Sequence, residues 1–357
     1  MKLSVRAWCC SVLWLLSAPA VWACAICAPA DVQHTLVQRL FAADAVVLAV
    51  ASDAGNGWRV LDTLKGVPPS APILVAAPSP DSAPAGTQLL AYSAATQSWR
   101  VLGHLEPTRT GWARRLMAMR RAVDTPEAAW PQRLAFFAPD LEHAEPLVAQ
   151  AAYEEISVAP YAAMRTLRPV LDAASLARWL DAPELASRRP LYTLLLGVAG
   201  AAAAAERLEA RLLGADAALA QGEHSALFAA YLELRGSAGL QWVERQFLTD
   251  PSRPEQALQA ALLALSVHGN DGVRLSRERV IQAYAALIRH NPARAGLVAS
   301  DLGNWERWEF ATDFAAILKS GTLQAFASRY GMVFYLMRNP TPAAREALQA
   351  LRAANLL

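Results

Sequence analysis

The sequence predicts an α+β, mostly α protein, in which a small N-terminal β-barrel or sandwich is followed by an α-helical solenoid. Residues 44–105 contain five short strand-like runs joined by links rich in Gly, Pro and Ser. From about residue 107 the apolar pattern changes to the helical period, and three later segments repeat one helix–turn–helix pattern. At 357 residues the chain is long for one small domain. We therefore predict a signal peptide at 1–23, a small β domain at 24–106 and a helical repeat domain at 107–357.

The start of the chain has the layout of a secretory signal. Lys2 and Arg6 form a positive beginning, an apolar run follows at 8–16, and small residues at Val21 and Ala23 fit the cleavage rule. Cleavage there predicts a periplasmic or secreted product. A retained membrane anchor is the alternative, because the same uncharged stretch could span a bilayer.

Cleavage after Ala23 would make Cys24 the new N-terminus, with Cys27 as the only other cysteine of the mature chain. Two nearby thiols in an oxidising compartment form a disulfide by default. A lipid chain on Cys24 is a second interpretation, and it would make the protein a membrane-anchored lipoprotein. Thiol redox chemistry of Cys24 and Cys27 is a third, although such pairs usually begin a helix that follows a strand. A zinc site would need two further ligands at suitable spacing, which the sequence lacks.

The β part of the prediction begins with one short helix. Apolar side chains at helical spacing predict it over residues 31–43. Runs of apolar and β-branched residues, some alternating with polar ones, then predict strands. The five strand candidates cover residues 44–52, 57–66, 72–77, 87–93 and 98–105. Short strands with turn-rich links are typical of a small barrel or sandwich.

Three stretches of this region resemble a secreted netrin-like, OB-type module. They are the cysteine pair at 24–27, the strand-like run at 43–51 and the strand ending in Leu-Lys-Gly at 60–66. The best-known members of this class are the tissue inhibitors of metalloproteases, in which the amino group and carbonyl of the N-terminal cysteine chelate the target enzyme's zinc. The resemblance implies an OB-type fold and an inhibitor-like role for Cys24. The cysteines here are separated by two residues rather than one, and the distant partner cysteines of that family are absent.

The helical part of the chain contains an internal repeat. Three leucine-rich segments each read as a helix, a glycine-bearing turn and a second amphipathic helix, and the turn glycines are Gly200, Gly236 and Gly269. Their spacings of 36 and 33 residues are typical of stacked helical pairs. An earlier segment, 141–167, resembles a HEAT-type repeat, in which a proline opens a helix. We therefore predict a HEAT-like solenoid over 107–357.

The sequence contains no recognisable catalytic motif. Its 33 basic and 31 acidic residues nearly balance and form no basic run, which argues against nucleic-acid binding. No zinc-binding histidine pair, nucleophile elbow, phosphate-binding loop or dinucleotide fingerprint is present. The densest group of potential ligands surrounds His143, where we predict a polar turn with helix-capping carboxylates. Glu154 and Glu155 are adjacent on a predicted helix, so they point about 100° apart and do not form a catalytic pair. We expect no cofactor and no metal.

Two tryptophans are the predicted candidates for partner binding. Trp305 and Trp308 lie three residues apart, so a helix would place both indoles on one face. Such a pair is usually packed into a core, and we expect this for at least one of the two. The alternative is an exposed aromatic anchor on the solenoid surface. The apolar segment at 329–338 is also predicted to be core.

These observations favour a non-enzymatic, exported binding or scaffold protein that presents a helical solenoid surface to a protein partner. Two alternatives stay open. One is a metalloprotease-inhibitor-like module acting through Cys24, and the other is a thiol redox protein using Cys24 and Cys27. No sequence feature names the partner.

Overall fold

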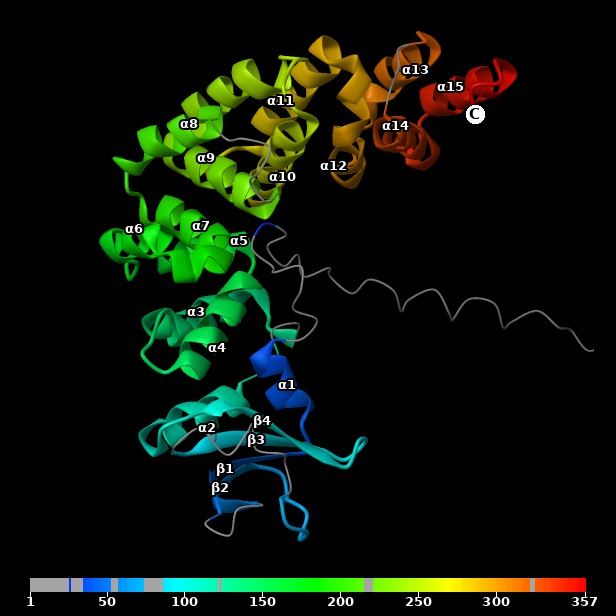
Figure 1. The fold of residues 1–357 in the computed structure, drawn as a ribbon. Helices are drawn as coiled ribbons and strands as arrows, with labels where there is room; N and C mark the ends of the chain where they lie inside the picture. Colours follow the sequence, from blue (N-terminus) through cyan, green and yellow to red (C-terminus); the bar gives the residue numbers. More distant parts are fainter. Residues whose placement is uncertain are drawn as a thin grey trace, which may run out of the picture.

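The computed structural model is mostly helical, with one small antiparallel sheet near its N-terminal end (Figure 1). The described residues are Ile26, 35–52, 57–73, 86–119, 121, 124–214, 221–321 and 325–357. The predicted α+β, mostly α composition is confirmed. The predicted signal peptide at 1–23, together with Cys24 and Cys27, lies outside the described residues.

Four of the five predicted strands form a single antiparallel sheet. They are β1 (Ala45–Ala51), β2 (Trp58–Lys65), β3 (Gln88–Ser93) and β4 (Ser98–His104), in the order β2-β1-β3-β4. In the remaining predicted strand, Ile73 makes one bridge to Trp58, and residues 74–77 are not among those described. Within the described residues the sheet is open, with β2 and β4 at its edges. The closure of a barrel or sandwich is therefore not seen there.

The central strand β1 is buried on both faces, which explains its unbroken apolar sequence. Val46 and Leu48 point to one side and belong to the main core, which continues into the helices. Val47 and Ala49 point to the other side, because successive side chains of a strand alternate between faces. There they form a small second cluster with Trp58, Ile73 and Leu90.

The short helix α1 (Leu36–Ala42) begins with a capping box. The Thr35 hydroxyl accepts a hydrogen bond from the Gln38 amide, and the Gln38 side chain accepts one from the Thr35 amide. A carboxylate from a distant part of the chain, that of Glu154, accepts a hydrogen bond from the Leu36 amide. The N-terminus of α1 is thereby attached to the helical part of the protein.

The Leu-Lys-Gly end of β2 secures the other end of α1. The Lys65 ammonium donates to the carbonyl oxygens of Phe41 and Ala43, both at 2.7 Å. A cation is favourable here because the last carbonyls of a helix lack partners within the helix. Gly66 follows with a φ of 66°, and a Cβ at this position would lie 1.9 Å from the Asp44 carbonyl oxygen. Only glycine fits this close approach of two backbone segments.

From residue 107 onward, helices follow one another along an arc (Figure 1). The helices nearest the sheet are α2 (Thr110–Ala118), α3 (Trp130–Phe137), α4 (Pro146–Ser157) and α5 (Tyr161–Met164). The middle of the arc contains α6 (Ala173–Asp181), α7 (Arg189–Ala199), α8 (Ala204–Gly214), α9 (Gln221–Val243), α10 (Glu255–Asp271) and α11 (Arg277–His290). The C-terminal end contains α12 (Ala299–Asn304), α13 (Ala311–Lys319), α14 (Phe326–Arg338) and α15 (Pro342–Ala353).

The predicted turn glycines are correct at two positions and wrong at the third. Gly200 ends α7 with a φ of 79°, and Gly236 breaks α9 with a φ of 56°. Gly269 lies inside α10 rather than in a turn, and the turn glycine is Gly272, with a φ of 69°. The three positive-φ glycines are therefore spaced evenly, by 36 residues each. At each of these three glycines the backbone departs from helical geometry.

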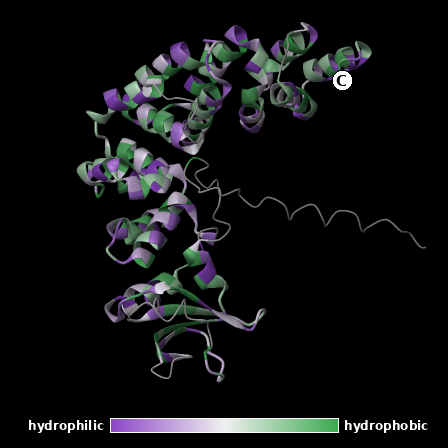
Figure 2. Ribbon diagram, in the orientation of Figure 1, coloured by the Kyte–Doolittle hydropathy of each residue, from purple (hydrophilic) through white to green (hydrophobic). Residues whose placement is uncertain are grey.

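Side chains pack continuously from the sheet into the helices. The main core cluster includes residues of β1 and extends to Leu351 in the last helix. Helix α4 lies so close to β4 that a Cβ on Gly103 would be 3.0 Å from the Leu147 side chain. On the other edge, Arg114 of α2 forms an ion pair with Asp62 of β2 at 2.7 Å. Hydrophilic and hydrophobic residues alternate around the helices, as amphipathic packing requires (Figure 2). The change of secondary structure near residue 106 is therefore bridged by side-chain contacts.

Candidate functional site

The predicted cysteine site lies outside the described residues, but one residue between the two cysteines does not. Ile26 is buried and belongs to the main core cluster. Its carbonyl oxygen lies beside Gly222 at the beginning of α9, where a Cβ on the glycine would be 3.4 Å away. The chain near the predicted N-terminus of the mature protein therefore contacts the helical arc. The disulfide, lipid and redox interpretations of Cys24 and Cys27 stay predictions.

The predicted shared helical face of Trp305 and Trp308 is wrong. Helix α12 ends at Asn304, and Trp305 occupies its C-cap position. Glu306 then adopts a φ of 57°, which ends any helix, and Trp308 begins a separate short 3-10 turn. The two indoles consequently point into different layers of the arc. Both are half-buried and pack against the main core.

Each tryptophan supports a neighbouring helix. The Trp305 indole stacks on Tyr284 with ring centroids 5.8 Å apart, and its Nε1 donates to Asn270 at 2.8 Å. It also covers Gly269, where a Cβ would lie 2.7 Å from the indole, so a small residue is needed there. The Trp308 indole packs on Tyr335 with ring centroids 5.4 Å apart. Trp308 thus lies beneath α14, on the side of that helix that faces the core.

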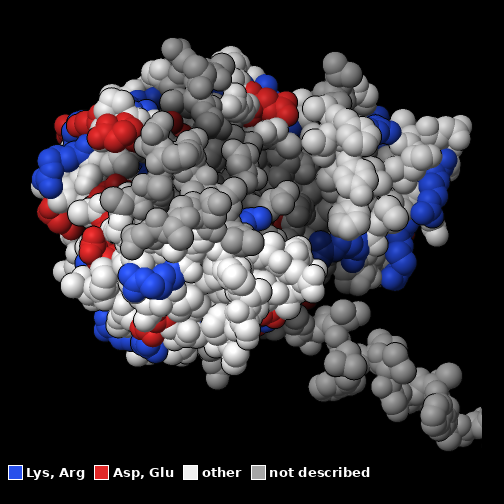
Figure 3. All heavy atoms as spheres, turned by 60° about the horizontal axis from the view of Figure 1, so that its bottom comes forward, with Lys and Arg blue, Asp and Glu red and all other residues white. Residues whose placement is uncertain are grey.

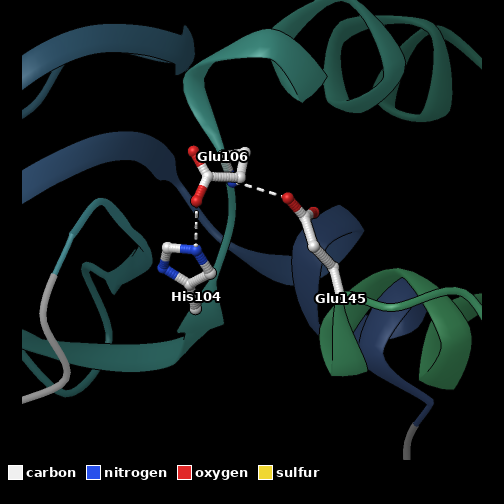
Figure 4. A group of neighbouring side chains, drawn as sticks. All are labelled: His104, Glu106 and Glu145. Carbon is white, nitrogen blue, oxygen red and sulfur yellow. Dashed lines mark hydrogen bonds and ion pairs between the residues drawn. The ribbon is translucent and has the colours of Figure 1, made fainter.

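A polar cluster joins β4 to α4 (Figure 4). His104 Nε2 lies 2.9 Å from Glu106 Oε1, and the Glu106 amide donates to Glu145 Oε1 at 3.1 Å. The predicted polar turn around His143 is confirmed, since residues 141–142 form a turn, residues 144–145 form a bend, and the His143 amide donates to the Asp140 carbonyl at 3.1 Å. The predicted capping role is wrong for Glu145, because it occupies the N-cap of α4 but makes no side-chain cap bond.

The same three side chains carry donor atoms of the kinds that bind divalent cations. Their ligand atoms lie within 4.8 Å of one another, and Glu145 Oε2 and His104 Nδ1 are buried without a hydrogen-bond partner. His104 Nε2 nevertheless points at Glu106, and Glu145 points at the Glu106 backbone (Figure 4). These contacts give the cluster a structural role, because they join the end of β4 to the start of α4.

A second polar cluster is a buried ionic network in the middle of the arc. The Arg165 guanidinium lies 2.6 Å from a Glu233 carboxylate oxygen and 2.7 Å from an Asp271 oxygen. The Tyr161 hydroxyl donates to Glu233 at 2.8 Å. His268 packs edge-on against the Tyr161 ring and hydrogen-bonds through Nε2 to a backbone carbonyl. The opposite charges neutralise one another inside the protein, so the network fixes α5, α9 and α10 relative to one another.

The buried imidazole of this network makes stability depend on pH. Burial lowers the pKa of His268 from 6.5 to about 4. The unfolded chain therefore binds the proton more readily, and stability falls as the pH drops from about 6.5 to about 4. Relative to His268→Gln, we expect the wild-type protein to lose about 3 kcal/mol over this range. Urea unfolding of both proteins at pH 7, 5.5 and 4 measures the difference between their free energies of unfolding. Burial raises the pKa of Asp271, which acts in the opposite direction, but Asp271 is present in both proteins and its effect cancels in the difference. If the free energies of unfolding of the two proteins changed with pH in parallel, His268 would not be the source of the pH dependence.

The most exposed apolar feature of the described residues is one face of α14. Phe326, Tyr330, Phe334 and Met337 are 84%, 59%, 44% and 63% exposed, and we call them the α14 stripe. Neighbouring rings stack, with centroids 6.1 Å apart for the first pair and 6.0 Å for the second. Every exposed aromatic side chain in the described part of the chain belongs to this stripe.

The opposite face of α14 is firmly seated in the protein. Met332, Tyr335 and Leu336 are buried in the main core. The helix crosses residues 292–298 at a contact between two glycines, where a Cβ on Gly331 would lie 2.3 Å from the Gly296 carbonyl oxygen. The stripe is therefore held on a rigid helix and does not belong to a loosely attached end.

The C-terminal segment that carries the stripe is basic. Residues 325–357 contain four arginines and one acidic residue, Glu346. The Arg338 guanidinium lies over the Phe334 ring, 5.7 Å from its centroid. Arg345 and Arg352 are exposed on α15, which packs beside α14. Basic side chains border the lobe formed by the C-terminal helices, while most of the visible acidic side chains lie elsewhere (Figure 3).

A comparison of the chain with protein-family models, curated proteins and solved structures finds no match. The resemblances to netrin-like modules and HEAT-type repeats therefore stay predictions. In the part of the chain that the structure describes, no helix is both long and apolar enough to cross a membrane.

The sequence patterns missed the α14 stripe. Segment 329–338 is predicted to be core, and this is correct for Tyr335 and Leu336 but wrong for Tyr330 and Phe334. A helix with apolar residues on all sides is usually buried throughout. The recurrence of aromatic residues at every fourth position, from Phe326 on, is the one sequence signal that separates the exposed face from the buried one.

Proposed function

We propose that this protein is a non-enzymatic, exported binding protein that uses the α14 stripe to contact a protein partner. The observation that carries the proposal is the stripe itself, a row of four large apolar side chains left exposed on one rigid helix. Contiguous apolar patches on a soluble protein mark interaction sites. Aromatic residues that are already ordered bind at a low cost in side-chain entropy.

In this proposal the helical arc is a HEAT-like solenoid, and its role is to present the stripe to the partner. Stacked helical pairs create extended surfaces, and the even spacing of Gly200, Gly236 and Gly272 fits such a repeat. The stripe lies on α14 near the C-terminal end of the arc (Figure 1). Trp308, one of the two predicted binding residues, acts through its contact with Tyr335 on the buried side of α14. Trp305 supports the preceding layer.

The experiment compares partner recovery by the exported wild-type protein and by variants of the stripe. Partners are co-purified, identified by mass spectrometry and then measured individually for affinity. We expect Tyr330→Ser to weaken binding of the true partner by about 30-fold, because central aromatic residues dominate interface energies. The melting temperature should hardly change, since the side chain is 59% exposed.

Val170→Ser is the matched control, because Val170 is 64% exposed and lies far from α14 in the sequence. It should leave both the affinity and the melting temperature unchanged. A partner that binds the wild-type protein and the Tyr330→Ser variant equally would refute the role of the stripe.

A further inference from the structure

We propose that the α14 stripe binds an acidic amphipathic helix of its partner. This inference rests on the proposed function and adds the chemistry of the partner segment. It combines two independent properties of the surface, namely the shape of the apolar row and the charge around it.

The shape of the stripe fits another helix. Its residues occupy positions i, i+4, i+8 and i+11, so they form one narrow row along the axis of α14. Eleven residues of helix rise by about 16 Å, which corresponds to about three helical turns. An amphipathic helix presents an apolar row of the same width and repeat, and two such rows pack through their side chains.

The charge of the surface selects an acidic helix. Arg338 borders the stripe directly through its contact with Phe334, and the residue is exposed, with one guanidinium nitrogen donating to Asn304 at 3.1 Å. Arg345 and Arg352 are exposed seven residues apart, so they lie on one face of α15. With only Glu346 to balance four arginines in 325–357, this end of the molecule carries an excess of positive charge. A carboxylate flanking the apolar row would face Arg338 across the interface, and the positive charge of α15 adds to the attraction at longer range.

The same charges argue against a second copy of this chain as the occupant. Two α14 helices packed against each other would bring two sets of arginines together, and like charges across an interface are unfavourable. An anionic membrane surface would satisfy the charges. However, the stripe is a single row on a helix whose other face is buried, and a partner helix covers such a row more completely than a flat surface does.

The test uses two synthetic helical peptides with the same leucine row, one with glutamate and one with lysine at the flanking positions. Fluorescence anisotropy with the full chain measures both affinities. We expect the glutamate peptide to bind at least about 10-fold more tightly at low salt, and this preference should shrink at 1 M salt. Phe334→Ser with Tyr330→Ser should weaken both peptides, because they share the apolar row.

Charge variants separate this inference from the proposed function. Arg338→Gln, at the arginine that contacts Phe334, should weaken the glutamate peptide by about 5-fold or more. Arg207→Gln, at an exposed arginine of α8, is the control and should change nothing. Equal affinity for the two peptides, or a preference for lysine, would overturn the acidic assignment and leave the stripe as a docking site.

Failure of both peptides, together with stripe-dependent binding to vesicles of phosphatidylglycerol and phosphatidylethanolamine, would replace the helix by a membrane surface. Elution of the full chain as a dimer that Tyr330→Ser makes monomeric would replace it by a second copy.

Discussion

Replacing Arg133 by methionine is expected to destabilise the protein by about 3–5 kcal/mol, one of the two largest effects we anticipate. Arg133 of α3 and Glu155 of α4 form an ion pair whose side chains are 4% and 1% exposed, with Nε 2.9 Å from the carboxylate. Without the guanidinium, a buried carboxylate would lose its partner charge. Burial already raises the pKa of Glu155 even with Arg133 present. Urea unfolding at pH 7 measures the loss.

The double variant Arg133→Met with Glu155→Leu is the informative companion. A well-packed apolar pair often matches or exceeds the stability of a buried ion pair, so we expect the double variant to recover most of the loss. Lowering the pH should also relieve the single variant, because protonation removes the unpaired charge from Glu155. If Arg133→Met alone unfolds at the same urea concentration as the wild-type protein, the ion pair is not buried as described.

The second large effect is expected at the crossing beneath α14. A Cβ on Gly296 would lie 1.7 Å from the Ser328 carbonyl oxygen, a backbone atom that cannot move aside as a side chain can. Gly296→Ala should therefore cost about 3 kcal/mol and lift α14 away from residues 292–298. Urea unfolding gives the energy, and faster proteolysis near α14 would show where the loss occurs.

Gly111→Ala is the control for this variant, because no atom lies within 4 Å of a Cβ at Gly111. It is helical, in the first turn of α2, so alanine should be neutral or slightly stabilising there. Equal stability of the two variants would show that the close approach of Gly296 and Gly331 to the neighbouring backbone is not tight.

The fold is predictable from the sequence where local patterns determine it. The apolar run of β1 and the helical periods after residue 107 depend on side-chain alternation, and the structure follows both. The turn near Gly269 shows the limit of this approach. Gly269 and Gly272 lie three residues apart. Gly269 leaves room for the Trp305 indole and Gly272 adopts a positive φ, and the sequence alone does not show which glycine has which role.

The site was less predictable because it depends on tertiary position. The chain breaks between Trp305 and Trp308 at Glu306, a residue with no special tendency to end helices, so the pattern wrongly continues one helix through both tryptophans. The exposure of Tyr330 and Phe334 was also not predictable, because it depends on which helices pack against α14. The described helices cover only one face of α14, and a sequence repeat does not reveal which helix lacks a neighbour.

The central claim is that the α14 stripe is the surface through which this protein binds its partner. The most direct measurement places a photo-crosslinking amino acid at position 330 or at position 170 of the full-length protein and irradiates living cells. We expect one protein to be crosslinked from position 330 and not from position 170, through a helical segment rich in acidic residues. The same protein should lose affinity for the Tyr330→Ser variant in solution. Equal crosslinking from both positions, or a crosslinked protein that binds wild type and Tyr330→Ser alike, would contradict the claim.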